Sequence, residues 1–321
     1  MRAIYYSNHG DAAVLTEGDL PVPACAPHQV LVRVSAAGVN PIDRRLRAGE
    51  LQEYISRTFP VVPGWDFSGV IETVGSDVDG WRVGDEVVGL AFTWSVQHGT
   101  YAEYVPVDAT AIARKPPSIS FTDAAALPLV SLTAWQSLSE FGALQAGQSA
   151  FIQAGAGGIG SVAIPMAKHL GCWVYTTCSA ANAEYVAELG ADVVIDYTRQ
   201  SYVDVIKQER PAGVDLVLET LYGDDISRSA ISLAADGGAV VFMNNEPPEL
   251  AEIEERELRS IFLHHRPDGK MLDELMKKYE AGQLPIPPVE VMPLSEAVEA
   301  HRRSETGRTR GKLVLQVRAT G

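Results

Sequence analysis

The feature that most limits what this chain can fold into is a glycine-rich turn between a short apolar strand and a helix. Residues 149–153 have the composition of a buried strand, and residues 159–170 have the apolar spacing of a helix. Between them lies the segment Ala154-Gly155-Ala156-Gly157-Gly158-Ile159-Gly160. A strand that turns into a helix in this way begins a βαβ unit, so the sequence predicts an α/β domain with a doubly wound parallel sheet.

This turn has the Gly-x-Gly-x-x-Gly spacing of a dinucleotide site. Gly155 permits the tight turn, Gly157 lets a pyrophosphate approach the backbone, and Gly160 lets the helix pack closely on the strand. The N-terminus of the helix favours the charge of a phosphate. The sequence therefore predicts cofactor contacts at Gly155, Gly157, Gly158, Ile159 and Gly160. The alternative is a glycine turn that binds no nucleotide.

The end of the next predicted strand indicates which nucleotide is bound. An NAD enzyme normally places Asp or Glu there, on the ribose hydroxyls. This strand instead ends Thr176-Thr177-Cys178-Ser179, with no carboxylate to repel a 2′-phosphate. Because Thr177 and Ser179 can donate hydrogen bonds to a phosphate, the sequence favours NADPH over NADH.

The rest of the chain follows two patterns, in keeping with a length of 321 residues. Before residue 120, short apolar runs separated by Gly, Pro and Asp predict strands at 30–34, 67–74, 86–90 and 101–107. Ser120 is expected to begin a helix. Beyond it, predicted strands at 149–153, 173–177, 193–195, 214–219 and 239–244 alternate with helices at 159–170 and 183–189. Helices at 270–281 and 295–303 precede a strand at 312–317, which has no βαβ partner and is expected to return to the first domain.

Composition and charge exclude several classes of protein. The 41 acidic residues outnumber the 26 basic ones and give a net charge of -15, which argues against a nucleic-acid partner. No apolar run approaches the ~20 residues of a membrane-spanning helix, and the first residues do not predict a signal peptide. Three scattered cysteines fit a reducing compartment better than a disulfide framework. We therefore expect a cytoplasmic protein with no membrane partner.

Five further motifs stand in a specific order along the chain. They are Ala37-Gly38-Val39-Asn40-Pro41-Ile42-Asp43, Pro63-Gly64-Trp65-Asp66-Phe67-Ser68-Gly69, Gly84-Asp85-Glu86-Val87, Leu189-Gly190-Ala191-Asp192 and Gly311-Lys312-Leu313-Val314-Leu315. With the glycine turn, they resemble the medium-chain dehydrogenase/reductase superfamily, and within it the zinc-free quinone oxidoreductase group related to zeta-crystallin. The resemblance implies a GroES-like β domain built from both chain ends (1–122 and 260–321), with a Rossmann domain inserted between them (123–259). It also implies an active site in the interdomain cleft and a homodimer formed through the edge of the Rossmann sheet.

The resemblance further implies that this chain works without zinc. The catalytic ligands of zinc-dependent relatives stand where this chain has Asn40, Trp65 and, approximately, Leu129. None of these three side chains is a usual zinc ligand, and the four clustered cysteines of a structural zinc site are also absent from the sequence. We predict no metal site.

Roles for single residues follow from the same resemblance. It places Asn40, Thr133 and the backbone near Asn244 against the nicotinamide and its ribose. Tyr197 is expected near the adenosine phosphate, and Lys312 among the cofactor contacts. All five are predicted cofactor-binding residues, and Asn40 is also a predicted catalytic residue.

Asn182 is the one predicted cofactor contact that departs from the family pattern. Relatives often have a lysine at about this place, where it pairs with the 2′-phosphate. The departure weakens the prediction of NADPH and leaves NADH possible. Arg199, or Arg308 from the tail, could supply the missing charge.

The acceptor side of the site is predicted from three residues, each with a simpler alternative. Tyr54 is a predicted proton donor, and therefore catalytic, or only a packing residue. Arg45 stands where many relatives have a tyrosine, and it binds an anionic acceptor or is a solvated surface residue. Trp65 forms an apolar wall for a flat acceptor or fills the space that zinc occupies elsewhere.

The leading functional hypothesis is a zinc-independent NADPH-dependent oxidoreductase. It would pass hydride to a quinone or another electron-poor enone or carbonyl compound, a small-molecule acceptor. Such chemistry needs little acid–base machinery because the cofactor carries the reaction. Two alternatives are a trans-acting reductase of enoyl thioesters and a non-enzymatic nucleotide-binding protein of the crystallin or regulator kind.

Overall fold

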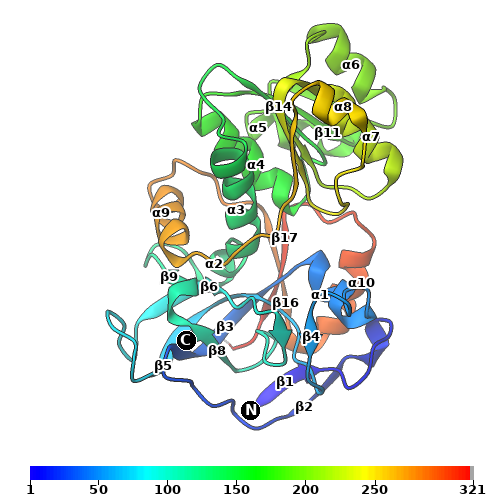
Figure 1. The fold of residues 1–321 in the computed structure, drawn as a ribbon. Coiled ribbons are helices and arrows are strands. Elements are labelled where there is room, and N and C mark those ends of the chain that lie inside the picture. Colours follow the sequence, from blue (N-terminus) through cyan, green and yellow to red (C-terminus); the bar gives the residue numbers. More distant parts are fainter. Residues whose placement is uncertain (319–321) are drawn as a thin grey trace. The chain divides into compact units, whose positions relative to one another are not determined.

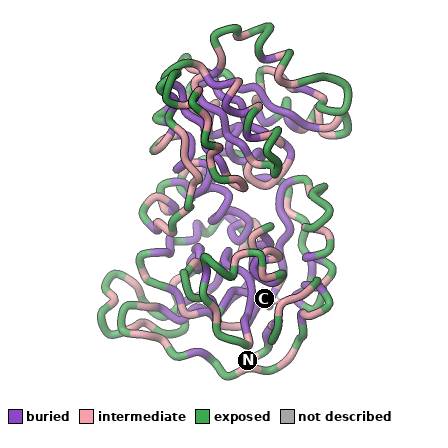
Figure 2. Tube along the Cα trace, turned by 45° about the vertical axis from the view of Figure 1, so that its right-hand side comes forward, coloured by how far each residue is buried: buried purple, intermediate pink, exposed green. Residues whose placement is uncertain are grey.

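A computed structural model describes residues 1–318 and divides the chain into two compact units (Figure 1). Unit 1 comprises Met1–Leu132, Arg266–Gly282 and the chain from Ile286 onward. Unit 2 comprises Thr133–His265 and Gln283–Pro285. In each unit the buried residues gather in the interior and the exposed ones lie on the outer loops (Figure 2).

Unit 1 is rich in β-structure. Its strands are β1 (Arg2–Tyr5), β2 (Thr16–Asp19), β3 (Gln29–Val39), β4 (Ser56–Arg57), β5 (Asp66–Val74), β6 (Glu86–Leu90), β7 (Ser95–Val96), β8 (Tyr104–Asp108), β9 (Ile112–Arg114), β16 (Val289–Pro293) and β17 (Lys312–Gln316). The main sheet has the order β16-β17-β3-β5-β6-β9, and β8 also pairs with β3. The predicted return of the final strand is confirmed, because β17 lies antiparallel to β3 with Leu313 opposite Val39.

The helices of unit 1 pack on this sheet or on one another. They are η1 (Ala12–Val14), α1 (Pro41–Ala48), η2 (Ala109–Ala111), α2 (Phe121–Ala125), α9 (Gly269–Glu280), η5 (Leu294–Glu296) and α10 (Ala297–Glu305), while α3 (Pro128–Trp135) crosses into unit 2. Ser120 begins α2 as predicted, since its Oγ accepts the N–H of Asp123. Gly38 lets α2 lie close to β3, because a Cβ at this position would stand 2.5 Å from the carbonyl oxygen of Ala125.

Unit 2 contains a parallel sheet with the strand order of a doubly wound fold. Its strands are β10 (Ser149–Ile152), β11 (Trp173–Cys178), β12 (Val193–Asp196), β13 (Val214–Glu219), β14 (Ala234–Phe242) and β15 (Arg259–Phe262). Their order across the sheet is β12-β11-β10-β13-β14-β15, and each neighbouring pair is parallel. The order reverses between β10 and β13, so a ligand is expected at the carboxyl ends of these strands.

Helices lie along both faces of the unit 2 sheet. They are η3 (Gln136–Phe141, a π-helix), α4 (Gly158–His169), η4 (Ala180–Asn182), α5 (Ala183–Glu188), α6 (Tyr202–Glu209), α7 (Asp224–Leu233) and α8 (Ala251–Glu255). Across residues 1–318, no helix combines the length and apolar character needed to span a membrane.

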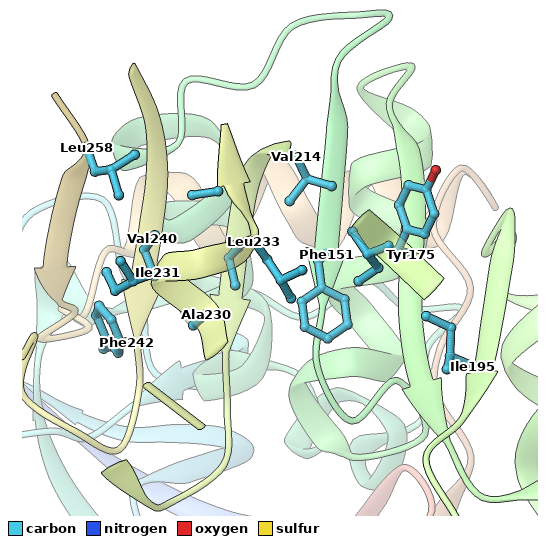
Figure 3. Close-up of a cluster of buried hydrophobic side chains, with 13 residues drawn as sticks. Phe151, Tyr175, Ile195, Val214, Ala230, Ile231, Leu233, Val240, Phe242 and Leu258 are labelled. Atoms are coloured by element: carbon cyan, nitrogen blue, oxygen red, sulfur yellow. The ribbon is translucent and has the colours of Figure 1, made fainter. Parts of the chain in front are cut away.

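One face of this sheet carries a continuous apolar core. Phe151 and Val240 lie on strands of the sheet in the same cluster as Ile231 of α7 (Figure 3). Val217, on the strand between them, and Ile206 of α6 belong to the same cluster. All five side chains are at most 1% exposed. Because alternate residues of a strand face opposite sides, Ala150 and Ile152 turn to the other face, where α4 packs. The sheet is therefore buried on both faces, as parallel sheets are.

Candidate functional site

The glycine turn of unit 2 is held in place by the neighbouring strand β11. The N–H of Ala154 donates to Oγ1 of Thr177 over 3.1 Å, and the N–H of Gly155 donates to the Thr177 carbonyl over 2.9 Å. Thr177 is only 3% exposed, so within this unit it supports the turn from behind. Ala154 itself has a φ of +54°, a left-handed conformation that is unusual outside glycine.

The three glycines of the motif have different surroundings. A Cβ on Gly155 would lie 2.3 Å from Oγ1 of Thr176, and one on Gly160 would lie 2.5 Å from the carbonyl oxygen of Ala154. A Cβ on Gly157 would meet only that same carbonyl oxygen, at 3.3 Å. Gly155 and Gly160 are therefore required by the packing of the turn, whereas Gly157 leaves one face of it open.

Helix α4 begins at this open face. Its N-cap is Gly157, which has no side chain to accept the first N–H groups of the helix. The N-terminal N–H groups and the helix dipole together favour an anion. The turn therefore fits the pyrophosphate of a dinucleotide, on the predicted residues Gly157, Gly158, Ile159 and Gly160.

The carboxyl ends of β11 and β12 lie side by side and bring together several predicted residues. Cys178 and Asp196 are opposite each other in the sheet. Just beyond them, the half-buried Ser179 Oγ is 3.5 Å from Nδ2 of Asn182, and Tyr197 is 59% exposed. No carboxylate ends β11.

The carboxylate that ends β12, Asp196, is bonded within its own loop. It accepts the N–H of Thr198 at 3.0 Å and the Thr198 hydroxyl at 2.7 Å, and it pairs with Arg199 at 3.6 Å. These hydrogen bonds hold the pKa of Asp196 below its usual value. The Arg199 side chain is 78% exposed, so the loop that follows β12 presents a cation to solvent.

A second polar group lies where the strand order reverses. Oε1 of Gln153 accepts the N–H of Thr220 at 3.2 Å, and the Thr220 hydroxyl donates to the Gln153 carbonyl at 3.0 Å. Nδ2 of Asn244 donates to the Thr220 carbonyl at 2.6 Å. The predicted residue Asn244 is thus tied to the ends of β10 and β13, at the same edge of the sheet as the glycine turn.

Glu219 is a buried carboxyl group at this edge that the sequence analysis did not single out. Its Oε2 accepts Nδ2 of Asn245 at 3.2 Å, and the residue is 1% exposed. Burial raises the pKa of Glu219 to about 7, against the opposing effect of the Asn245 hydrogen bond. The sequence offered one signal for this residue, since Glu219 is a carboxylate at the end of an otherwise apolar strand. In doubly wound folds the carboxyl ends of the strands face the ligand.

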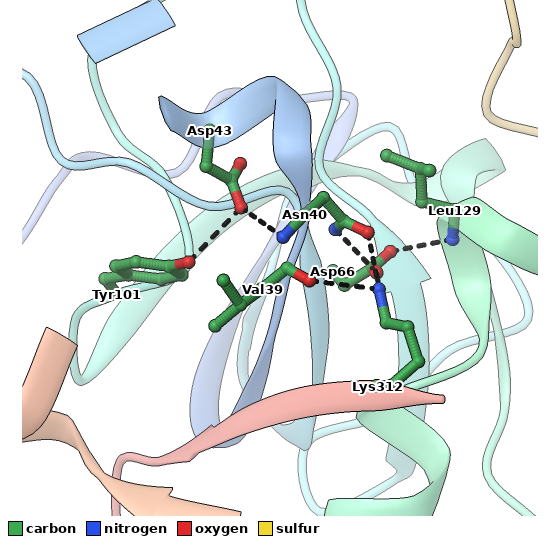
Figure 4. A network of polar contacts seen from close by, with 7 residues as sticks. All are labelled: Val39, Asn40, Asp43, Asp66, Tyr101, Leu129 and Lys312. Atoms are coloured by element: carbon green, nitrogen blue, oxygen red, sulfur yellow. Dashed lines mark hydrogen bonds and ion pairs between the residues drawn. The ribbon is translucent and has the colours of Figure 1, made fainter. Parts of the chain in front are cut away.

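In unit 1, Asn40 belongs to a buried polar network (Figure 4). Its Nδ2 donates to Oδ2 of Asp66 at 2.8 Å, and its Oδ1 accepts a hydrogen bond from Nζ of Lys312. Lys312 also donates to the Val39 carbonyl at 3.2 Å and pairs with Asp66 at 3.3 Å. The other oxygen of Asp66 accepts the N–H of Leu129 at 2.7 Å. The structure therefore joins two predicted residues, Asn40 and Lys312, through a carboxylate.

The network continues to a second carboxyl group, that of Asp43. Its Oδ2 accepts the N–H of Asn40 at 2.8 Å and the hydroxyl of Tyr101 at 3.2 Å. Burial, with a smaller contribution from the Asp66 charge, raises the pKa of Asp43 to about 7. Asp43 is therefore protonated more readily than an exposed carboxyl group.

The three acceptor-side residues lie on three different segments of unit 1. Trp65 is 3% exposed and precedes Asp66 at the start of β5. Arg45 lies on α1 and donates to Glu50 at 3.0 Å. Tyr54 is 67% exposed in the segment that follows α1.

Thr133, the remaining predicted contact, is the first residue of unit 2 and lies on α3. It is 1% exposed, and within residues 1–318 its Oγ1 has no hydrogen-bond partner. The predicted residues are divided between the two units. Asn40, Lys312, Arg45, Tyr54 and Trp65 lie in unit 1, and the others lie in unit 2.

Comparison with known proteins identifies the family. Residues 26–117 match the alcohol dehydrogenase GroES-like domain, and residues 189–315 match the zinc-binding dehydrogenase family. The 2-methylene-furan-3-one reductase of Solanum lycopersicum is 34% identical over 98% of this chain and 79% of its own length. The chain belongs to the medium-chain dehydrogenase/reductase superfamily. Its place is in the quinone oxidoreductase branch.

Two further relatives support this place in the superfamily. The chloroplastic NADPH-dependent alkenal/one oxidoreductase of Arabidopsis thaliana is 34% identical over 98% of this chain and 79% of its own length. The solved quinone oxidoreductase of Coxiella burnetii is 34% identical, covers 99% of both chains and superposes with a TM-score of 0.87. The predicted α/β fold, with a GroES-like domain and a Rossmann domain, is confirmed.

The zinc named in the description of one matched family does not fit the residues of this member of the superfamily. Positions 40, 65 and 129 offer an amide, an indole and an isobutyl group, none of them a usual zinc ligand. The amide of Asn40 is already bonded to Asp66 and Lys312. Within residues 1–318, no three His, Cys, Asp or Glu side chains gather in a way that could hold a metal ion.

Proposed function

We propose that this chain is an NADPH-dependent oxidoreductase that reduces an enone or a quinone. The glycine turn is the observation that carries the proposal. It combines an uncapped helix N-terminus, a Gly157 open on one side and two glycines required by packing. The non-enzymatic alternative shares this turn, but the relatives are named as reductases and oxidoreductases.

The acceptor class is supported by what the named relatives have in common. A methylene-furanone, an alkenal or alkenone, and a quinone all contain a carbonyl group conjugated to a carbon–carbon double bond. Hydride transfer to the conjugated system gives an enolate from an enone and, as the net product, a hydroquinone anion from a quinone. Either anion then takes a proton. We propose that this chain acts on the same class of compound.

Each group of residues has its own task in this reaction. The bound cofactor would supply the hydride. The N–H groups of Gly158, Ile159 and Gly160 would hold its pyrophosphate. Asn244 holds the segment that follows β14 by its hydrogen bond to the Thr220 carbonyl. The exposed phenol of Tyr54 delivers the proton that the reduced acceptor requires.

A preference for NADPH over NADH is supported by the charges at the ends of β11 and β12. Ser179, Asn182 and Arg199 offer donors and one exposed cation to a 2′-phosphate. Asp196 is bonded to Thr198 and paired with Arg199. Arg199 thus supplies the positive charge for the 2′-phosphate that relatives often supply with a lysine at about the place of Asn182.

We also propose that the protein forms a homodimer through β15. This strand ends the unit 2 sheet on one side, so its outer edge offers unpaired backbone groups to a second copy. Light scattering coupled to gel filtration would give about twice the chain mass if this is so, and the mass of one chain if it is not.

The experiment that tests the function measures oxidation of NADPH and NADH by their nicotinamide absorbance. The acceptors are a quinone, an alkenone and an enoyl thioester, with protein treated with a chelator. Turnover of the quinone or the alkenone is expected. Turnover of the thioester alone would favour an enoyl-thioester reductase, and cofactor binding without any turnover would favour a non-enzymatic protein.

Cofactor preference is tested with Ser179→Asp, which places a carboxylate beside the 2′-phosphate. We expect the KM for NADPH to rise at least tenfold while that for NADH changes little. Ser201→Ala, at the N-cap of α6, is the matched control on a neighbouring loop. Equal effects of Ser179→Asp on both cofactors would contradict the proposed position of the phosphate.

A further inference from the structure

Three aromatic rings of unit 1 form a continuous series from its core to its surface. Trp65 and Phe92 have ring centroids 4.8 Å apart and planes at 87°. Phe92 and Trp94 have centroids 5.0 Å apart and planes at 81°. These edge-to-face contacts are favourable ring geometries. Exposure increases along the series, which we call the aromatic ladder, from 3% at Trp65 to 54% at Trp94.

The exposed end of the ladder is fixed by its backbone. Strand β7, which starts directly after Trp94, pairs with β4 so that Ser56 lies opposite Ser95. The N–H and the hydroxyl of Ser56 both donate to the carbonyl of Trp94, at 3.0 and 3.1 Å. The Thr93 hydroxyl donates to the Ser95 carbonyl at 2.9 Å. These hydrogen bonds fix the backbone at Trp94, whose indole ring is partly exposed to solvent.

The inner end of the ladder adjoins the buried polar network. Trp65 directly precedes Asp66, which binds Asn40 and Lys312. The Ala91 N–H donates to the Trp65 carbonyl at 2.7 Å, so the segment that carries Phe92 begins at the same strand ends. Tyr54 stands two residues before Ser56, on the segment that fixes Trp94. The ladder therefore lies between Asp66 of the buried polar network and the segment that carries Tyr54, a predicted acceptor-side residue.

We propose that Trp94, supported by Phe92, is a specificity-determining residue that selects flat aromatic acceptors, of the naphthoquinone type, over short aliphatic enones. This inference rests on the proposed function and names its substrate class more closely. An uncharged aromatic surface gains most from a partner that is itself a flat ring, because stacking adds to the burial of apolar area. A short aliphatic enone covers only a small part of an indole.

The test compares kcat/KM for a naphthoquinone with kcat/KM for but-3-en-2-one, in the full-length protein with NADPH. We expect Trp94→Ala to lower the ratio of the two values at least about fivefold, and Trp94→Phe to restore most of it. Trp173→Ala is the matched control, since Trp173 lies in unit 2 and is also well exposed, at 42%. It is expected to leave the ratio unchanged.

The possible failures have different signatures. If the wild-type protein reduces neither acceptor, the proposed function is wrong and the inference falls with it. If the wild type reduces both and Trp94→Ala changes both to the same extent, the function stands and the inference is overturned. A ratio that also falls in Trp173→Ala would overturn it as well, because the effect would not belong to the ladder.

Discussion

Replacing Gly157 with alanine should separate cofactor binding from folding. Gly157 has φ -76° and ψ 176°, which alanine adopts readily, and the added Cβ would lie 3.3 Å from its nearest neighbour, the Ala154 carbonyl oxygen. Loss of glycine at an N-cap costs roughly 1 kcal/mol, and the reduced freedom of the unfolded chain offsets about 0.4–1 kcal/mol of that. The free energy of unfolding should therefore change by less than about 1 kcal/mol.

The added methyl group would nevertheless stand where a pyrophosphate approaches the turn. We expect the Kd for NADPH to rise at least tenfold, which is about 1.4 kcal/mol of binding free energy. The Kd is measured by titrating the protein with NADPH and following nicotinamide fluorescence. The melting temperature, measured without nucleotide, should stay within a few degrees of that of the wild type.

Gly160→Ala is the matched comparison. Its Cβ would meet backbone atoms, with the Ala154 carbonyl oxygen at 2.5 Å and Cα of Gly155 at 2.6 Å. Overpacking of this kind costs about 1–3 kcal/mol, so this variant should lose both stability and affinity. If Gly157→Ala binds NADPH as tightly as the wild type, the turn does not hold the pyrophosphate and our account of the site is wrong.

Three further predictions concern unit 1. His301 is fully buried with its Nδ1 3.0 Å from Nη1 of Arg47, and burial followed by the Arg47 charge lowers its pKa to about 3. Since the unfolded chain alone takes up this proton between pH 6.5 and 3, the stability of the wild type should fall by about 1.6 kcal/mol from pH 6.5 to 5, a loss that His301→Gln does not share. Urea unfolding measures both, and parallel curves would refute this. Lys312→Met leaves the fully buried Asp66 unpaired and should cost about 3–5 kcal/mol, and urea unfolding should show much of this recovered in the double variant with Asp66→Asn. Tyr54→Phe should lower kcat at least tenfold if its phenol gives the proton, without changing the melting temperature; an unchanged kcat would leave proton delivery to solvent.

The parts of the fold predicted correctly from sequence are those with local causes. The turn at residues 154–160 follows from glycine spacing between a strand and a helix, and the start of α2 follows from the cap at Ser120. The predicted strand at 86–90 matches β6 residue for residue. The predicted strand at 101–107 begins too early, because β8 starts at Tyr104, while Tyr101 is drawn inward and donates to Asp43.

The polar network of unit 1 could not be predicted from local pattern. Asn40 and Lys312 are 272 positions apart, and only the pairing of β17 with β3 brings them together. The resemblance to a family supplied both residues, and Asp66 stands in one of its motifs, but the motif does not show that this carboxylate joins Asn40 to Lys312. The ring contacts of the aromatic ladder could not be predicted for a similar reason. Trp65 and Phe92 are in contact only because β5 pairs with β6.

The placement of β17 has a consequence for how the protein is made. Unit 2 is almost wholly one stretch, Thr133–His265, so it can close as soon as that stretch has left the ribosome. The sheet of unit 1 cannot be completed until β17 has been synthesised, and β17 follows all of unit 2 in the chain. Until Lys312 arrives, the carboxylate of Asp66 has no ammonium beside it. We therefore expect the N-terminal strands of unit 1 to stay incompletely folded during synthesis. Pairing of β17 with β3 then places the Lys312 ammonium beside the Asp66 carboxylate.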